Sequence, residues 1–200
     1  LTGNISGTTS FTTSAIKSIA ASASGNSTAQ TLTFASGTAL TLDNGLSSTG
    51  VDFVVFNNAI NSGGGSGSIS VNAPTQILIN ANLTGGTGGV SLTANQSGTS
   101  SGDNDGILVN SGATISAAGS GTVSVTGTGS SGSGSFNMGV YVQGTITSSG
   151  GAVSVIGTGG SGGGGTNVGV YVDTTGKITA GGSGTVTVDG TGGGTGSANY

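Results

Sequence analysis

Cysteine, histidine, arginine, glutamate and tryptophan are all absent from this sequence of 200 residues. Without cysteine, the chain has no disulfide and offers no thiolate to a metal ion. Its only basic side chains are Lys17 and Lys177, which leaves a formal net charge of −4. A protein without a basic patch cannot neutralise phosphates, so nucleic-acid binding is not expected. The sequence also has no run of about eighteen apolar residues, so we expect no transmembrane helix.

The same absences limit the chemistry that the chain can perform. Its only close acidic pair is Asp103 and Asp105, with no arginine, histidine or glutamate to assist them. Sugar-cleaving β-helices need clustered carboxylates, so we predict that the chain is not an enzyme and assign no catalytic, cofactor-binding or metal-binding residue. The string Asp103–Gly106 alternates oxygen-bearing side chains before a glycine, as calcium loops do, but it lacks their later bidentate glutamate. Turn chemistry explains the string as well, so calcium at Asp103 and Asp105 stays an open alternative.

What the sequence does contain is a repeat of short apolar triplets. Met138–Val142 reads Met-Gly-Val-Tyr-Val, and Val168–Val172 reads Val-Gly-Val-Tyr-Val thirty residues later. Periods of this length describe stacked units, each of which buries its apolar side only against a neighbour. The 45 glycines alone would be compatible with disorder, but valine, isoleucine and threonine recur at regular intervals and favour order.

Each repeat predicts one coil of three strands. In each triplet the first and third residues are large and apolar and the second points outward, which is the two-residue period of a β-strand. Side one is predicted to bury Ile77, Ile79, Ile107, Val109, Val140, Val142, Val170 and Val172. Side two is predicted to bury Leu83, Ile115, Ile146 and Ile178. Side three is predicted to bury Ile69, Val71, Val90, Leu92, Val123, Val125, Val153, Val155, Val186 and Val188. The predicted fold is therefore all-β: a right-handed parallel β-helix, or solenoid, with three strands per coil.

We expect residues 1–200 to form a single β-helical region and the array to continue past Tyr200. Coils are predicted to be shorter and irregular in 1–92 and about 30–33 residues long in 93–200, within an overall range of 22–33. The later coils carry Gly-rich inserts, 126–137 and 156–167 among them, which form either mobile loops or a fourth wall; their constant length favours order. Residues 1–30 are ambiguous, since 15–23 have helical spacing within a Thr/Ser-rich context that favours strands.

Several strings, including Gly150–Val155, Ile60–Gly65 and Ser6–Phe11, resemble the repeat regions of filamentous-haemagglutinin-like and autotransporter-type bacterial adhesins. The resemblance covers essentially the whole chain. It implies a large secreted or surface-tethered β-helix, and thus a bacterial extracellular fibre or stalk. The chain has no Asn-Pro dipeptide and no recognisable secretion domain, so the export route is not indicated. No catalytic residue can be carried over from such repeats.

Two rows of side chains are expected to point outward. On side three the row is small and hydroxylated: Ser70, Ser91, Ser124, Ser154 and Thr187. On side one it is large and apolar: Leu78, Leu108, Tyr141 and Tyr171. A stacked apolar row forms a continuous patch, and such patches mark contact surfaces. We expect Tyr141 and Tyr171 to be mostly buried, by the Gly-rich inserts or by a second chain, and not to line a sugar cleft.

The leading functional hypothesis is a structural one: an extracellular fibre or adhesin segment of the bacterial cell surface. It would form a rigid rod that self-associates, end to end through coil stacking or laterally through Leu78, Leu108, Tyr141 and Tyr171. A host or neighbouring cell surface is the other expected partner. The alternative is a carbohydrate-binding or carbohydrate-cleaving β-helix, which requires convergent aromatics or carboxylates. Ice binding would need a regular Thr-x-Thr array, and on side three only Thr185–Thr187 conforms.

Overall fold

The computed structural model describes residues 16–24 and 28–196, and these residues form nineteen β-strands in three parallel sheets. Side three contains β1 (Ser18–Ser22), β4 (Gly45–Thr49), β7 (Ser68–Ala73), β10 (Val90–Ala94), β13 (Val123–Thr128), β16 (Val153–Thr158) and β19 (Val186–Thr191). Side one contains β2 (Thr31–Phe34), β5 (Phe53–Phe56), β8 (Gln76–Ile79), β11 (Ile107–Val109), β14 (Val140–Val142) and β17 (Val170–Val172). Side two contains β3 (Leu40–Thr41), β6 (Ile60–Asn61), β9 (Leu83–Gly85), β12 (Thr114–Ala117), β15 (Thr145–Ile146) and β18 (Lys177–Ile178).

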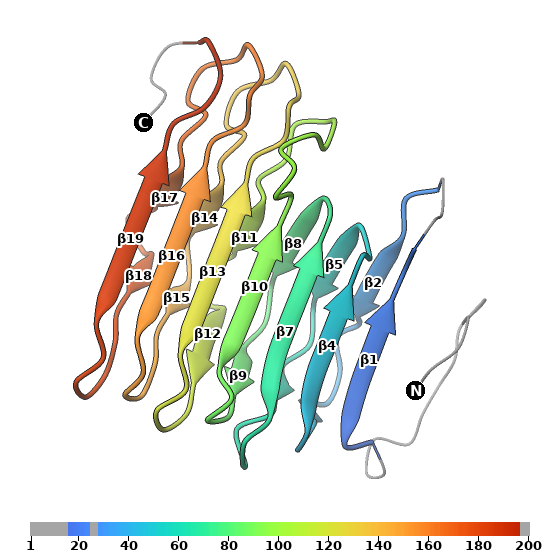
Figure 1. Cartoon of the computed structure of the whole chain (residues 1–200), viewed down its shortest axis with the longest axis vertical. Coiled ribbons are helices and arrows are strands. Elements are labelled where there is room, and N and C mark those ends of the chain that lie inside the picture. Colours follow the sequence, from blue (N-terminus) through green and yellow to red (C-terminus); the bar gives the residue numbers. More distant parts are fainter. Residues whose placement is uncertain (1–15, 25–27, 197–200) are drawn as a thin grey trace.

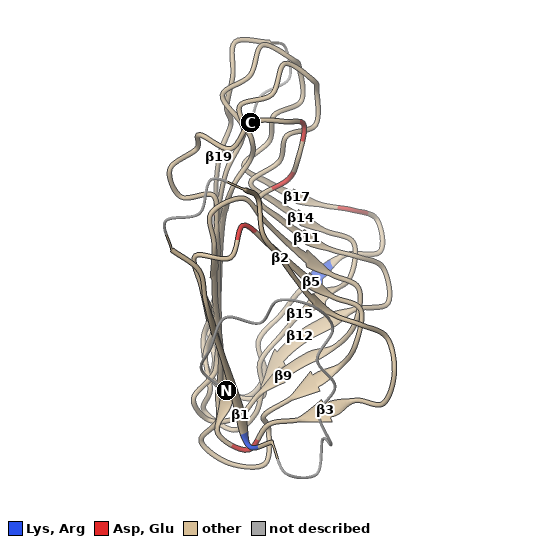
Figure 2. Cartoon of the chain, turned by 90° about the vertical axis from the view of Figure 1, so that its right-hand side faces the viewer, with Lys and Arg blue, Asp and Glu red and all other residues tan. Residues whose placement is uncertain are grey.

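The strands follow one another in a strict cycle of side three, side one and side two, so every third strand pairs with its predecessor. Figure 1 shows side three in front, running from β1 at the right to β19 at the left, with side one behind it. In Figure 1 the strands of side three point upward in front, the chain returns through side one behind them, and successive coils advance from right to left, which is a right-handed winding. Figure 2 looks along the stack, where the three sides enclose a triangular interior. The predicted right-handed parallel β-helix with three strands per coil is confirmed.

The register of the strands confirms the predicted stacking. On side one, Val140 pairs with Ile107 below and Val170 above. On side two, Ile146 pairs with Ile115 and Ile178. Parallel in-register pairing places like side chains about 4.8 Å apart and bonds each strand to its neighbours in the stack. The sequence repeat is therefore the direct cause of the fold.

The interior of the triangle is a single apolar column. Along the strands between the two end coils, its buried side chains alternate with outward-facing ones. The largest fully buried side chains are Phe56, Leu42, Leu46, Ile60, Ile69, Ile77, Ile79, Leu83, Leu92, Ile107, Ile115 and Ile146. Phe34 stacks on Phe56 with ring centroids 4.9 Å apart and an interplanar angle of 1°. Since each side contributes only one row or two to this column, no coil has a core of its own.

The early coils contain strands that the apolar pattern did not reveal. Segment 15–23 has helical spacing, yet Ser18–Ser22 forms β1, in register with β4. β4 itself was missed because Ser48 occupies an inward position that aligns with Val71 in β7. β6 was missed because only Ile60 marks it. Apolar alternation does mark the other early strands, since β2, β3 and β5 lie at Thr31–Phe34, Leu40–Thr41 and Phe53–Phe56. Residues 1–15 lie outside the described part.

The Gly-rich inserts form ordered loops that extend past the corner between side three and side one (Figures 1 and 2). We call each of these loops an arm. The first residues of an insert prolong the strand of side three, as in β13 and β16, and the rest returns to side one. Successive arms are hydrogen-bonded, with the Gly129 amide donating to the Thr158 carbonyl (2.8 Å) and the Phe136 amide to the Gly165 carbonyl (3.2 Å). The arms are therefore ordered, as their constant length indicated.

Glycine is required where the two limbs of an arm meet. A Cβ built on Gly157, in the outgoing limb, would lie 2.0 Å from the Gly169 carbonyl oxygen of the returning limb. A Cβ built on Gly127 would likewise lie 2.2 Å from the Gly139 carbonyl oxygen. Between the limbs, two buried asparagine side chains bond to the backbone. Asn137 Nδ2 donates to the Gly134 carbonyl, and Asn167 Nδ2 donates to the Gly164 carbonyl. Backbone contact and amide hydrogen bonds, rather than apolar packing, thus hold the arm together.

Candidate functional site

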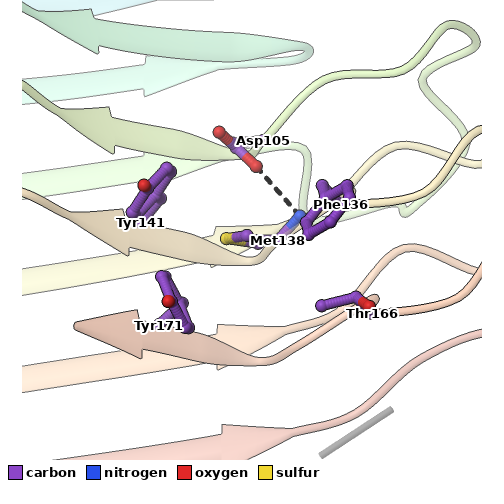
Figure 3. A pocket seen from close by; sticks show the side chains of 6 residues that line it. All are labelled: Asp105, Phe136, Met138, Tyr141, Thr166 and Tyr171. Atoms are coloured by element: carbon purple, nitrogen blue, oxygen red, sulfur yellow. Dashed lines mark hydrogen bonds between the residues drawn. The ribbon is translucent and has the colours of Figure 1, made fainter. Parts of the chain in front are cut away.

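A pocket lies where the arms meet the outer face of side one. It is lined by Asp105, Phe136, Met138, Tyr141, Thr166 and Tyr171, and its volume is about 250 Å³. Figure 3 shows that Tyr141 and Tyr171 project from β14 and β17, and that Phe136, Met138 and Thr166 come from the returning limbs of two arms. We call this the tyrosine pocket. It exists only because an arm stands beside an outward-facing strand residue.

The two tyrosines are stacked by the repeat itself. Tyr141 pairs with Tyr171 in the parallel register, and their ring centroids lie 5.3 Å apart with an interplanar angle of 63°. This edge-to-face geometry is favoured for aromatic pairs. Tyr171 is 40 % exposed, whereas Tyr141 is half-buried. The inserts cover Tyr141 in part and leave Tyr171 exposed, so burial of Tyr171 by a second chain stays a prediction. The expectation that the rings stand apart from any polar cleft is wrong, because both line a pocket that also contains a carboxylate.

A hydrogen-bonded network holds the Tyr141 hydroxyl. The hydroxyl donates to Asp173 Oδ2 (3.1 Å) and accepts from Gln143 Nε2 (2.9 Å). Burial raises the pKa of the Tyr141 hydroxyl, with the Asp173 charge acting in the same direction. The amide of Thr174 and the Tyr141 hydroxyl lower the pKa of Asp173, which stays a carboxylate at neutral pH. The network fixes one ring and places a negative charge beside it.

Asp105 is the second acidic group and lines the pocket from just before β11. Its Oδ1 accepts from the Met138 amide of the next coil (3.0 Å), as drawn in Figure 3. Its Oδ2 has no hydrogen-bond partner within the described residues. Desolvation raises the pKa of Asp105 to about 6, although the Met138 amide opposes the shift. The carboxylate is therefore held in the pocket at a cost in solvation free energy.

Phe136 is an exposed aromatic on a strained backbone. Its φ of 66° lies in the left-handed region, where bulky residues are rare, and the residue is 61 % exposed. Thr166, one period later, has a φ of 61°. The arm therefore imposes this conformation at the same place in successive coils. Holding a phenylalanine there costs on the order of 1 kcal/mol, without burial in return.

The outward rows are confirmed by the strand pairing. Leu78, Leu108, Tyr141 and Tyr171 are consecutive partners on side one, and Val55 extends the row by one coil. On side three the row of Ser70, Ser91, Ser124, Ser154 and Thr187 is in register as well. The apolar row ends in the tyrosine pocket at its later coils. The pocket is thus the part of a longer apolar stripe where polar groups converge.

The structure gives both members of the Asp103/Asp105 pair a contact with the following arm. Asp103 Oδ1 accepts from the Gly134 amide (2.8 Å), while Asp105 accepts from Met138. A Cβ on Gly134 would approach the Asp103 carboxylate to 2.4–2.6 Å, so glycine leaves space for it. Both carboxylates therefore bond to the backbone of the next arm and not within their own turn. Within the described residues, no cluster of three or more acidic, histidine or cysteine side chains is placed to hold a metal ion.

Phe136, Met138 and Thr166 are pocket residues that the sequence did not single out. One signal was available: Phe136 is the only large apolar residue in the insert 126–137. In the part of the chain that the structure describes, no helix is long and apolar enough to cross a bilayer. Comparisons with protein-family models, curated proteins and solved structures found no match for this chain.

Proposed function

We propose that this chain is a rod-forming segment of an extracellular bacterial surface fibre or adhesin, without enzymatic activity. The observation that carries the proposal is the single apolar column through every described coil, wrapped in three in-register parallel sheets. Such a stack lengthens by adding coils without enlarging its cross-section, which is what a stalk requires. The resemblance of its Gly/Ser/Thr/Val strings to bacterial adhesin repeats supports the same assignment.

The last described coil has an open face. Its inward-pointing residues Val172, Val186 and Val188 are 43 %, 44 % and 48 % exposed. Their equivalents one coil earlier are buried. A hollow of about 360 Å³ lies at this face, lined in part by Val170, Val188 and Tyr171. A further coil, either of this chain or of a second copy, would cover it, because unpaired strand edges promote strand addition.

Electron microscopy of the purified chain tests the rod. We expect slender particles that elongate by end-to-end stacking as concentration rises, together with sedimentation of species larger than a monomer. A matched variant, Val186→Lys with Val188→Lys, places two charges on the open coil face and should leave short rods. Round particles, or a monomer that the two lysines do not alter, would contradict the proposal. Surface labelling of cells that produce the native protein tests the localisation.

Carbohydrate binding is the second candidate function, and the tyrosine pocket favours it. Two stacked rings beside Asp105 and Asp173 provide the apolar faces and hydrogen-bond acceptors that sugars use. Titration of the protein with a panel of uncharged oligosaccharides tests this. Binding that is lost in Tyr171→Ala and kept in Tyr171→Phe would support it.

A further inference from the structure

Two side chains of the tyrosine pocket, Asp105 and Phe136, carry a free-energy cost at their positions. Asp105 occupies a position that is Met138 and Val168 in the following two coils, so a carboxylate replaces an apolar residue. Phe136 has a strained backbone and an exposed ring. Natural chains keep such local conflicts mainly where function needs them. Their meeting in one pocket points to a ligand.

The charge of the pocket selects the kind of ligand. Asp105 is partly buried, and neither lysine of the chain is among the residues that line the pocket. Asp173, bonded to Tyr141, adds a second negative charge nearby. An anionic ligand would be repelled, and an uncharged apolar one would bury the carboxylate without compensation. Aromatic rings also attract cations through their negative faces. All of these terms favour a positively charged group.

We propose that the tyrosine pocket binds an organic ammonium group, held by the rings of Tyr141, Tyr171 and Phe136 and neutralised by Asp105. A volume of about 250 Å³ admits a small alkylammonium group and not a folded partner. The group can belong to a free cation or to the amine of an amino sugar on a surface glycan. The proposal concerns a ligand and does not depend on the rod assignment; the amino-sugar source would join it to the carbohydrate candidate.

Choline and its uncharged isostere 3,3-dimethylbutan-1-ol are the decisive probes, since they differ in charge and hardly in shape. Met138 is the only methionine in the sequence and lines the pocket, so its ε-methyl NMR resonance reports occupancy directly. We expect choline to shift this resonance with a dissociation constant on the order of 1 mM, an ordinary value for so small a ligand. The isostere should bind at least tenfold more weakly.

Variants separate the two contributions. Asp105→Asn keeps the shape of the side chain and an acceptor for the Met138 amide, and should reduce the preference for choline over its isostere to about twofold or less. Tyr171→Ala should weaken choline binding about tenfold. Tyr171→Phe keeps the ring and should bind as the parent does, because the Tyr171 hydroxyl makes no hydrogen bond to any residue that the structure describes. Ser91→Ala, on side three, is a control that should change nothing. Melting temperatures verify that each variant is folded.

The source of the ammonium group is resolved by a second pair of probes. Glucosamine oligomers and their N-acetylated forms share the sugar ring and differ in the amine charge. Tighter binding of the glucosamine oligomer than of choline assigns the site to a glycan, and equal binding assigns it to the free cation. Equal affinity for charged and uncharged members of both pairs would overturn the proposal, as would an unmoved Met138 resonance at 50-fold the expected dissociation constant, about 50 mM.

Discussion

The coils before and after Leu92 turn the same corner in two different ways. Between β7 and β8, only Pro74 and Thr75 connect side three to side one. Between β13 and β14, residues 129–139 make the same connection and form an arm. The short corner keeps the chain against the apolar column, whereas the arm leaves it. Both corners deliver the next strand in the same register, so the stack tolerates either.

The two regions also differ in what holds them together. The early coils rely on large side chains, among them the stacked Phe34 and Phe56. The arms rely on glycines in close contact and on buried asparagines bonded to the backbone. The arms add little to the apolar column, but they form a wall beside the outward row of side one. Where they are absent there is no tyrosine pocket, so the difference concerns binding more than folding.

The largest predicted effect tests whether the two regions share one core. Ile146, in an armed coil, and Ile60, in an armless one, are both almost fully buried on side two. Ile146→Asp should lower the free energy of unfolding by about 3–5 kcal/mol, because it buries an unpaired charge in the common column. Denaturant unfolding followed by circular dichroism measures it. Thr145→Asp, at the outward neighbour, should cost less than about 0.5 kcal/mol. Two separate transitions would show that the regions are independent.

A second prediction concerns the arms alone. Gly157→Ala places a methyl group against the Gly169 carbonyl oxygen and should cost about 2 kcal/mol through displacement of one limb. The matched control is Gly163→Ala, whose added Cβ meets nothing within 4 Å. Amide hydrogen exchange should show faster exchange at residues 159–169 and unchanged protection in β7 and β8. Equal effects of the two substitutions would contradict the account of the arm.

The third prediction uses the pKa of Asp105, which burial raises from its ordinary value of 3.8 to about 6 in the folded state. The folded protein therefore binds more protons between these values, and the free energy of unfolding falls as pH rises from about 4 to 6. Asp105→Asn should remove this dependence. At pH 7 it should increase stability by about 1–2 kcal/mol, since the carboxyl is only partly buried. The lowered pKa of Asp173 has the opposite effect: it makes the free energy of unfolding decrease as pH falls, and only at lower pH.

The smallest effect lies in the early coils. Ser48 is 1 % exposed, and its hydroxyl is one of two buried side-chain groups without a hydrogen-bond partner within the described residues. Ser48→Ala should raise the free energy of unfolding by about 1 kcal/mol, because it removes an unsatisfied polar group. Ser70→Ala, at an exposed position on the same side, is the control. A loss of stability in Ser48→Ala would indicate a bond that the structure does not contain.

The later coils could be predicted from the sequence because apolar residues recur at the first inward positions of each strand, and glycine follows them only where an arm begins, as at Gly127 and Gly157. β4 and β6 could not, since Ser48 and a single Ile60 break the period and only pairing with neighbouring coils defines those strands. The outward row on side one was also predictable from alternation. The pocket was not, because Phe136 and Asp105 lie outside any strand and reach Tyr141 only through the course of the arm. Loop geometry of this kind has no periodic signature.

The orientation of the hydrogen bonds in the three sheets has a mechanical consequence. They run along the stack, so a force that draws its two ends apart would peel coils off one after another instead of breaking the whole column at once. Releasing the coil between Val140 and Val170 frees thirty residues, or about 100 Å of extended chain. The coil between Phe56 and Ile79 frees twenty-three residues, or about 80 Å. In a single-molecule pulling record, the spacing between force peaks would reveal which coil has yielded.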